Sequence, residues 1–506
     1  MLTNNLEKKT MSKFQERQQA IANGSHALVI GSGIAGLLAA RVLLNHFDRV
    51  TIVERDSLPE QPQSRPGVPQ SVQSHGLLVR GQRILDQLFP GLDAELIAAG
   101  AIAVDWSADV LHISSMGIAP RCPSDLMGLE CSRNLLEWAI RRRLAGCDRL
   151  QFLEATQVKQ LLADESKSRV TGVQLRDRQG RAFGERNNSE LGELTADLIV
   201  DASGRNSCLP KWLEELGYPA PSETVIDAFF GYTTRWYERP ANWQADSKEL
   251  FVSPEPPNEP RCGVLSPIEG DRWLLSLYGF GRDYPPTDEV GFLEFARTLR
   301  SPILYEAVKD AKPLSPVYSY RRTENRLRHY EQSKLPEGIV ALGDAVFAFN
   351  PYYGQGMTAA ALSALVLDRC LHQRWRQSQN APIGFGQHFQ KQLARSLKTP
   401  WQYSTRSDRA WLTSEDSIDT ATKPNQIYQL LGQYVEQVML LSMDCPEVHR
   451  TMLEIYHMVK PPIAFFQPNI AAKVLRQAWQ KQMHKRKGGG DWARSQLSDR
   501  NSNPIG

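Results

Sequence analysis

Three glycines stand at the G-x-G-x-x-G spacing in the segment GSGIAG, as Gly31, Gly33 and Gly36. The segment follows an apolar run and opens an Ala- and Leu-rich run, which is the order strand, turn, helix. In that setting the first glycine permits a tight turn, the second lets the backbone approach a pyrophosphate, and the third allows close packing of helix on strand. Glu54 ends the next apolar run, 18 residues after Gly36, where a carboxylate accepts hydrogen bonds from ribose hydroxyls. This pattern predicts a dinucleotide-binding unit, and the alternative is an ordinary turn with a solvated Glu54.

A second glycine-bearing segment, GDAVFAFNPYYGQGMT, follows another apolar run and precedes an Ala-rich run. Its carboxylate, Asp344, can accept hydrogen bonds from ribityl hydroxyls or support a pyrophosphate. Gly354, Gly356 and Met357 can present backbone N–H groups to flavin N1 and the C2 carbonyl, where a helix N-terminus favours negative charge. The first fingerprint fits FAD and NAD alike, whereas this segment favours FAD. A Gly-Asp pair by itself is usually only a turn.

At these residues the sequence resembles the FAD-dependent monooxygenase superfamily with the para-hydroxybenzoate hydroxylase-like fold, over residues 25–371. The resemblance implies that Asp344 contacts the flavin and that Arg80 and Arg133 approach the FAD. Arg55, beside Glu54, is included among the expected cofactor-binding residues. The alternative for the arginines is ordinary surface charge.

The segment DLIVDASGRNS, with Asp201, Gly204 and Arg205, resembles the squalene epoxidase-like, polyketide epoxidase-like, geranylgeranyl reductase-like and halogenase branches. The segment RPGVPQSVQSHGLLVRGQRIL is most similar to the epoxidase-type branch, where it lies beside the flavin. His75 in this segment is the one catalytic candidate, and the alternative is a structural hydrogen bond. Halogenation is not expected, because no lysine occurs between Lys13 and Lys159 and the W-x-W-x-I-P signature is missing.

The elements that must position these residues follow from apolar periodicity. Strands are expected at residues 26–31, 49–54, 169–176, 196–201 and 338–342. Helices are expected at residues 34–45, 81–91 and 357–371, and after Ser132, whose side chain can cap a helix. Residues 57–74 hold four prolines, so we expect a loop with few ways to bury itself that covers the site and is mobile until ligand binds.

The predicted fold class is α/β, a Rossmann-like FAD-binding domain with an inserted antiparallel β-sheet substrate domain and a C-terminal helical region. Short β-rich runs between residues 228 and 280 carry the inserted sheet. The expected boundaries are a polar N-terminal extension 1–24, the FAD-binding domain in two parts 25–215 and 331–382, the substrate domain 216–330, the helical region 383–486 and a disordered tail 487–506.

Composition excludes several other classes of protein. The chain has 506 residues and a net charge of +3, which is too balanced to indicate nucleic acid as the partner. Its seven cysteines contain no C-x-x-C pair and its histidines no metal-ligand spacing, so we expect no metal and a reducing cytoplasm. No apolar run reaches the length of a membrane span, and no G-x-S-x-G elbow indicates a hydrolase.

The expected activity is transfer of one oxygen atom from a flavin C4a-hydroperoxide to an apolar substrate, by epoxidation or hydroxylation. We expect this reaction to belong to secondary metabolism. We expect aromatic and apolar residues of the inserted sheet to wall the pocket over the flavin: Phe229, Phe230, Tyr232, Trp236, Trp273, Leu275 and Tyr278. With no second nucleotide-binding motif, NAD(P)H is expected to bind transiently or to act through a flavin reductase. The alternatives are a geranylgeranyl reductase-like reductase or dehydrogenase and a non-catalytic flavin-binding protein. For the basic C-terminal segment we favour packing on the FAD domain over docking to an anionic membrane.

Overall fold

The structure is a computed structural model that describes residues 25–177, 192–241, 243, 245–374, 383–412 and 426–486. The expected N-terminal extension, residues 1–24, and the expected tail, residues 487–506, lie outside the described residues.

A five-stranded parallel sheet forms the centre of the larger core. Its strand order is β19 (Ile339–Ala341), β11 (Leu198–Asp201), β1 (His26–Ile30), β2 (Arg49–Val53) and β7 (Leu150–Leu153). Apart from the edge strand β7, these strands are short apolar runs buried along most of their length, as expected where helices cover both faces of a parallel sheet. The helices of this part are α2 (Ile34–Leu43), α3 (Val79–Leu88), α4 (Leu92–Ala98), α5 (Arg133–Ala145), α6 (Leu209–Leu216) and α9 (Gly356–Arg374). This arrangement confirms the Rossmann-like unit.

Three smaller sheets also occur among the described residues. One contains β10 (Gly192–Thr195), β9 (Val170–Asp177) and β8 (Thr156–Ala163), another contains β12 (Glu223–Ile226), β18 (Asn325–Arg328) and β20 (Phe347–Ala348), and a third pairs β3 (Ile102–Asp105) with β6 (Met127–Glu130). Short 3-10 turns lie at η1 (Pro69–Val72), η2 (Gly343–Ala345) and η3 (Pro351–Tyr353).

A second large sheet has seven strands. Their order is β17 (Tyr318–Tyr320), β13 (Gly231–Glu238), β16 (Arg272–Gly279), β15 (Arg261–Ile268), β14 (Glu249–Val252), β4 (Val110–Ser114) and β5 (Gly117–Ile118). All neighbours pair antiparallel except β14 and β4, which run parallel. This confirms the second sheet, but β4 and β5 come from residues that precede the expected insertion. The domain boundaries themselves stay a prediction.

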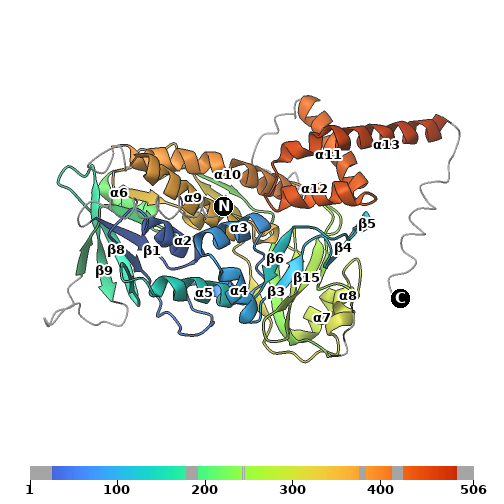
Figure 1. The fold of residues 1–506 in the computed structure, drawn as a ribbon, viewed down its shortest axis with the longest axis horizontal. Coiled ribbons are helices and arrows are strands. Elements are labelled where there is room, and N and C mark those ends of the chain that lie inside the picture. The colour runs from blue at the N-terminus through green and yellow to red at the C-terminus, as the bar shows by residue number, and fades with distance from the viewer. Residues whose placement is uncertain are drawn as a thin grey trace, which may run out of the picture.

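The two faces of the seven-stranded sheet pack against different partners. On one face Trp273 and Leu275 pack with Phe292 and Phe295, which belong to α7 (Glu289–Arg297), while α8 (Ile303–Val308) supplies Leu304 to the same cluster. The expectation that Trp273 and Leu275 wall the flavin pocket is therefore wrong, because successive side chains of a strand point to opposite faces. We call the other face, which carries Tyr232, Cys262 and Tyr278, the inner face; α7 and α8 lie below the sheet in Figure 1.

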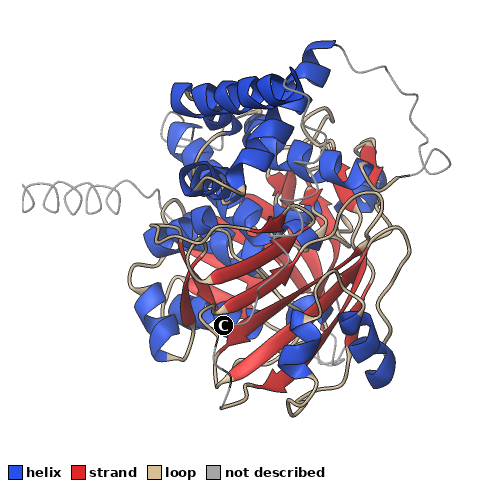
Figure 2. Ribbon diagram, turned by 90° about the vertical axis from the view of Figure 1, so that its right-hand side faces the viewer, coloured by secondary structure: helices blue, strands red, loops and turns tan. Residues whose placement is uncertain are grey.

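The C-terminal region is helical, as predicted. It contains α10 (Phe385–Arg409), α11 (Gln426–Ser442), α12 (Pro446–Tyr456), the 3-10 turn η5 (Pro462–Phe466) and α13 (Pro468–Arg486). Helix α10 packs on α9 and β19, and α11, α12 and α13 lie above the strands β4, β5 and β6 (Figure 1). Figure 2 shows the strands as a layer with helices on both sides. None of the described helices combines the length and the apolar character needed to cross a membrane.

Candidate functional site

The first glycine segment forms the turn between β1 and α2. Gly31 has φ +98°, a conformation that favours glycine, and a Cβ on Gly36 would lie 1.9 Å from the Gly31 carbonyl oxygen. Gly33 has φ −68°, and a Cβ there would meet no heavy atom within 4 Å. The turn therefore packs tightly at Gly31 and Gly36 and leaves open space at Gly33, in front of the α2 N-terminus. That is the space a pyrophosphate needs, as the spacing predicts.

Glu54 is buried at the end of β2 and is bound to the same turn. Its Oε2 accepts hydrogen bonds from the Ser32 N–H and Oγ at 2.8 Å each, and its Oε1 accepts from the Asp56 N–H at 3.0 Å. Glu54 is only 4% exposed, so the alternative of a solvated side chain is wrong. Because Oε1 has a single partner here, it keeps a lone pair for a ribose hydroxyl.

Arg65, which the sequence reasoning missed, anchors the proline-rich loop. It is 7% exposed, and its guanidinium lies 3.2 Å from Glu54 Oε2, 3.0 Å from Asp56 Oδ2 and 2.9 Å from Glu137 Oε1. The expectation that this loop has few ways to bury itself is wrong, since Val68 is buried as well. The signal that could have found Arg65 is the acidic pair Glu54 and Asp56, because buried carboxylates need a cation.

Three predicted residues that are far apart in the chain line one cavity. His75, Arg133 and Met357 border a small cavity of about 10 Å³ that is partly open to solvent. The remaining lining residues are polar or apolar side chains from α3, α4, β6, α5 and nearby segments: Leu77, Gln82, Leu96, Leu129, Cys131 and Leu136. Arg133 pairs with Glu137 at 2.7 Å, and its buried Nη1 has no hydrogen-bond partner among the described residues. The cavity is therefore lined by one cation, one imidazole and several apolar side chains.

His75 is a neutral hydrogen-bonding group in this cavity. Burial, assisted by the charge of Arg133, lowers the pKa of His75 to about 4. Its Nδ1 lies 3.0 Å from the Gln73 carbonyl oxygen. At neutral pH the ring therefore offers hydrogen bonds rather than a charge, which fits the structural alternative and leaves Nε2 free to contact a ligand.

The second glycine segment lies against the first. A Cβ on Gly343, which has φ +61°, would be 2.6 Å from the Cβ of Ala35 at the start of α2. Burial raises the pKa of the neighbouring Asp344, and the charges of Arg205 and Arg133 oppose that shift. Gly354 has φ +62°, and a Cβ on Gly356 would meet no atom within 4 Å. Gly343 and its neighbour Asp344 thus lie beside the start of α2, whereas Gly354 lies near Leu78 and Tyr456.

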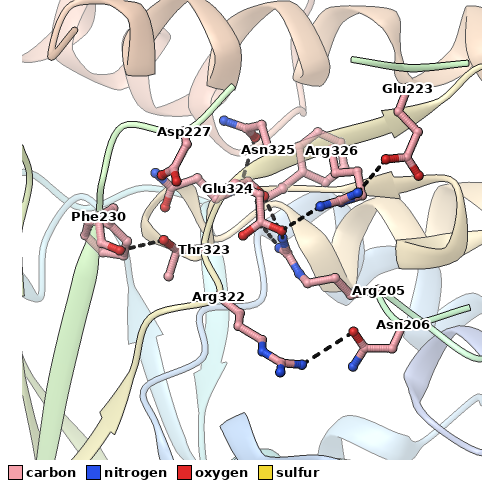
Figure 3. Close-up of polar contacts among 12 residues, drawn as sticks. Arg205, Asn206, Glu223, Asp227, Phe230, Arg322, Thr323, Glu324, Asn325 and Arg326 are labelled. Atoms are coloured by element: carbon pink, nitrogen blue, oxygen red, sulfur yellow. Dashed lines mark hydrogen bonds and ion pairs between the residues drawn. The ribbon is translucent and has the colours of Figure 1, made fainter. Parts of the chain in front are cut away.

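Arg205 links this second segment to the residue that precedes β18. It donates hydrogen bonds to the carbonyl oxygens of Glu324 at 2.6 Å and Phe349 at 2.9 Å. Figure 3 shows Arg205 reaching Glu324, while Arg322 points to Asn206. The guanidinium of Arg205 therefore joins Glu324, which precedes β18, to Phe349 in the segment that follows Asp344.

Two predicted arginines lie outside the cavity lining. Arg80 is exposed, and its backbone N–H donates to the His457 carbonyl oxygen at 3.2 Å. Arg55 is also exposed, and its Nη2 lies 3.5 Å from the Gly67 carbonyl oxygen. The structure does not bring them together with Arg133, and a cofactor contact by either stays a prediction.

The C-terminal helices also reach the site, which the sequence reasoning missed. Tyr456 at the end of α12 donates a hydrogen bond to the Tyr353 carbonyl oxygen at 3.4 Å. The next residue, His457, accepts a hydrogen bond from the Val79 N–H at 3.3 Å through Nδ1. No group of three or more metal-ligating side chains that could hold an ion occurs within the described ranges.

Comparison with known proteins finds no matching family model but several relatives. Protein Rv3254 of Mycobacterium tuberculosis is 34% identical over 354 residues, which are 69% of this chain and 73% of that protein. Kynurenine 3-monooxygenase of Salinispora tropica is 26% identical over 68% of this chain and 72% of its own length. Squalene epoxidase 2, mitochondrial, of Arabidopsis thaliana is 24% identical over 71% of this chain and 55% of its own length.

Two solved structures share the fold. A flavoprotein/dehydrogenase from Cytophaga hutchinsonii has a TM-score of 0.61 at 15% identity, covering 91% of this chain and all (100%) of that one. The p-nitrophenol 4-monooxygenase PnpA from Pseudomonas putida has a TM-score of 0.58 at 15% identity, covering 85% of this chain and 97% of that one. At this identity the likeness concerns the arrangement of helices and strands.

Proposed function

The chain belongs to the FAD-dependent monooxygenase superfamily, and we propose that it transfers one oxygen atom from O2 to a largely apolar substrate by epoxidation or hydroxylation. The protein is an oxidoreductase, and its cofactor is FAD. When bound and reduced by NAD(P)H, FAD supplies the activation of O2. We propose that NAD(P)H reduces the FAD, either directly on this enzyme or through a separate flavin reductase.

The residues present fit FAD. Open space at Gly33 and the N–H groups of the α2 N-terminus suit the pyrophosphate, and Glu54 suits the adenosine ribose. On the flavin side, Asp344 lies beside the start of α2, the backbone at Gly356 is open, and the unpartnered Nη1 of Arg133 is a donor for a cofactor oxygen or nitrogen. These assignments of individual residues are part of the proposal.

One observation carries this proposal: His75, Arg133 and Met357, from three distant parts of the chain, border one cavity with an apolar wall. In this arrangement Arg133 holds a polar group, the neutral His75 donates or accepts a hydrogen bond, and the leucines exclude water. Exclusion of water favours oxygen transfer over wasteful side reactions. The names of the relatives include a monooxygenase of kynurenine and an epoxidase of squalene, so they leave the substrate itself open.

The test is detection of an oxygenated product. Purified holoenzyme with NAD(P)H and a metabolite extract should consume O2 and yield a product 16 mass units heavier than its precursor, with the added oxygen derived from labelled O2. Asp344→Ala should retain less flavin and form less product, whereas the exposed Asp310→Ala should behave as wild type. Flavin reduction without oxygen incorporation would instead support the reductase alternative, and a flavin-loaded protein that turns over no substrate would support a non-catalytic role.

A further inference from the structure

Two buried carboxyl groups meet at the inner face of the seven-stranded sheet. Glu130 ends β6 and Glu249 begins β14, and they are 4% and 5% exposed. Glu249 Oε2 accepts a hydrogen bond from Ser266 Oγ on β15 at 3.0 Å, and β6 lies against β15. Glu130 Oε1 is buried and has no hydrogen-bond partner within the described part of the chain. We call Glu130 and Glu249 the acid pair.

Within the part of the chain that the structure describes, the acid pair has no counter-ion. No arginine, lysine or histidine among the described residues lies within ion-pair distance of Glu130 or Glu249. Burial raises the pKa of Glu249 to about 7, and burial together with the negative charge of Glu249 raises the pKa of Glu130. Buried carboxylates left without a cation cost several kcal/mol each. A pair that served folding alone would be expected to carry its own cation, as Glu137 does.

Aromatic side chains surround Glu249. Phe251 is two residues further along β14 and therefore on the same face. Tyr278 lies on the same face of β16, and Tyr352 contacts both, with ring centroids 5.9 Å from Tyr278 and 6.4 Å from Phe251. Burial and the nearby negative charge of Glu249 both raise the pKa of Tyr456. The aromatic faces thus come from the sheet, from the segment before Gly354 and from α12.

This aromatic wall adjoins the expected flavin-contacting segment. A Cβ on Gly354 would lie 3.9 Å from the Tyr456 hydroxyl oxygen. If the acid pair binds one end of the substrate, the reacting part of that substrate extends toward Gly354. The short path from Glu249 to Tyr456 to Gly354 connects the acid pair with the proposed active site.

Two neutral histidines on the same side also have unpartnered nitrogens. His112 faces Phe251 across the parallel pairing of β14 and β4, and its ring stacks on Phe251 at 5.0 Å. The Nε2 atom of His112 is buried and has no hydrogen-bond partner among the described residues. The same holds for the Nδ1 atom of His449, a residue that is 4% exposed. Burial lowers the pKa of each to about 4, so neither neutralises the acid pair at pH 7. Buried polar atoms of this kind point to a polar ligand group.

We propose that Glu130 and Glu249 bind a protonated amine of the substrate, so that the substrate is an amphiphile with an apolar body and a cationic nitrogen. Carboxylates and aromatic faces are the two kinds of group that proteins use to hold ammonium ions. Once ionised, the pair repels a fatty acid or another anionic substrate. This inference rests on the proposed function for the placement of the amine in the substrate.

Binding of three probes of equal chain length tests the inference without turnover. Oxidised holoenzyme is titrated with dodecylamine and dodecanoate below their critical micelle concentrations and with dodecanol below its solubility limit. The difference spectrum of the bound flavin is followed. Dodecylamine should bind at least tenfold more tightly than dodecanol, and dodecanoate should bind most weakly. Glu249→Gln, which keeps the shape of the side chain, should remove the preference for the amine and leave the affinity for dodecanol within twofold of wild type.

The matched control is Glu294→Gln on α7, which is exposed and belongs to a helix on the opposite face of the sheet. It should keep the amine preference. Glu130→Gln serves as the second variant if Glu249→Gln does not fold. Equal affinity for amine and alcohol, tighter binding of dodecanoate, binding of none of the three probes, or an amine preference that survives in both variants would overturn the inference. Because the readout needs no oxygen transfer, a failure of the proposed activity is recognised separately by the absence of product.

Discussion

Gly33 and Gly36 are three residues apart, yet side chains at the two positions would meet different surroundings. A Cβ at Gly33 meets no atom within 4 Å, whereas one at Gly36 would overlap the Gly31 carbonyl oxygen at 1.9 Å. We therefore expect Gly33→Val to fold with an unchanged melting temperature and to bind FAD at least tenfold more weakly, because the valine occupies the space of the pyrophosphate. Gly36→Ala should instead lose stability. Fluorescence titration of FAD and thermal unfolding measure the two effects.

The control for this comparison is Gly146→Val. Gly146 has φ −77° at the end of α5, and its nearest neighbour to a Cβ is the Arg143 carbonyl oxygen at 3.7 Å. This variant should bind FAD as wild type does. An unchanged FAD affinity in Gly33→Val would show that the pyrophosphate does not lie at this turn.

The acid pair predicts a pH dependence of amine binding. With the pKa of Glu249 raised to about 7, its carboxyl group is neutral below pH 7 and ionised above it. Dodecylamine stays protonated across this range, since alkylammonium groups titrate near the pKa of lysine, about 10.4. The affinity for dodecylamine should therefore increase as the pH rises from 6 to 8, and the affinity for dodecanol should not. An amine affinity that is constant over this range, or that falls, would contradict the role of Glu249; flavin difference spectra at each pH provide the measurement.

At the scale of elements, a buried network joins α10 to the segment that ends at Gly354. Asp408 on α10 is fully buried and accepts hydrogen bonds from Asn325 Nδ2 at 2.6 Å, Asn350 Nδ2 at 3.0 Å and the Tyr353 hydroxyl at 2.7 Å. One carboxylate therefore holds a strand, a turn and a helix together. This makes Asp408 a positioning residue for the proposed flavin-contacting backbone.

Substitution of Asp408 should weaken FAD binding and change the pH dependence of stability. Burial raises the pKa of Asp408 from 3.8 to about 7, so its stabilising contribution is complete below pH 3.8 and is lost as the pH rises through 7. The difference in unfolding free energy between wild type and Asp408→Asn should accordingly narrow from pH 4 to pH 8, while FAD affinity stays lower in the variant. Urea unfolding across this pH range measures the unfolding free energy, with Asp310→Asn as the exposed control. A difference in unfolding free energy between wild type and Asp408→Asn that does not change with pH would contradict the raised pKa of Asp408.

The proline-rich loop depends on Arg65. Arg65→Ala leaves Glu54 and Asp56 buried without this cation, and the loss of one partner from a buried ion pair costs about 3–5 kcal/mol. We expect a lower urea midpoint and faster proteolysis within residues 59–74, both with and without FAD. Arg297→Ala, on the surface of α7, should change neither. If the loop of Arg65→Ala resists protease as the wild-type loop does, the anchoring role is wrong.

The elements that sequence predicted best are those whose signal is local. The runs HALVI and RVTIV are contiguous, apolar and bounded by turns, so β1 and β2 lie within one residue of the expected limits. Ser132 caps α5 as predicted, since its side chain accepts from the Leu135 N–H at 3.1 Å. The pairing of β4 with β14 joins residues about 140 positions apart, and no local pattern indicates such a partner.

The sequence also did not indicate which face of a strand lies toward the site. Both faces of β16 are buried, with Trp273 toward α7 and Tyr278 toward the inner face, so alternation between apolar and polar residues does not distinguish them. The acid pair was missed for a related reason: Glu130 and Glu249 are isolated glutamates in the sequence, and only the folded chain buries them together.

At the scale of the whole molecule, the C-terminal helices complete a site whose cofactor part lies elsewhere. The large core contains the parallel sheet with α2, α9 and α10, whereas α11, α12 and α13 have a small core of their own that contains Val438, Val448 and Ile470. The contacts of Tyr456 with Tyr353 place α12 beside the inner face. This packing fits the expectation that the region lies on the rest of the enzyme, and docking to a membrane stays an untested alternative.

Removal of the last helices should therefore separate cofactor binding from substrate recognition. A chain that ends after Leu412 lacks α11, α12 and α13 but keeps the glycine turn, Glu54, Asp344 and Asp408. We expect it to bind FAD within threefold of the full chain, since the large core is intact, and to lose the tenfold preference for dodecylamine because Tyr456 no longer covers the inner face. A chain that ends after Gln467 lacks α13 and the residues that follow it but retains α11 and α12, and it should keep both properties. Flavin content and the difference-spectrum titrations distinguish the two shortened chains. An amine preference that persists without α12 would place the amine away from Tyr456. Loss of FAD from the shorter chain would show that the C-terminal helices support the cofactor as well.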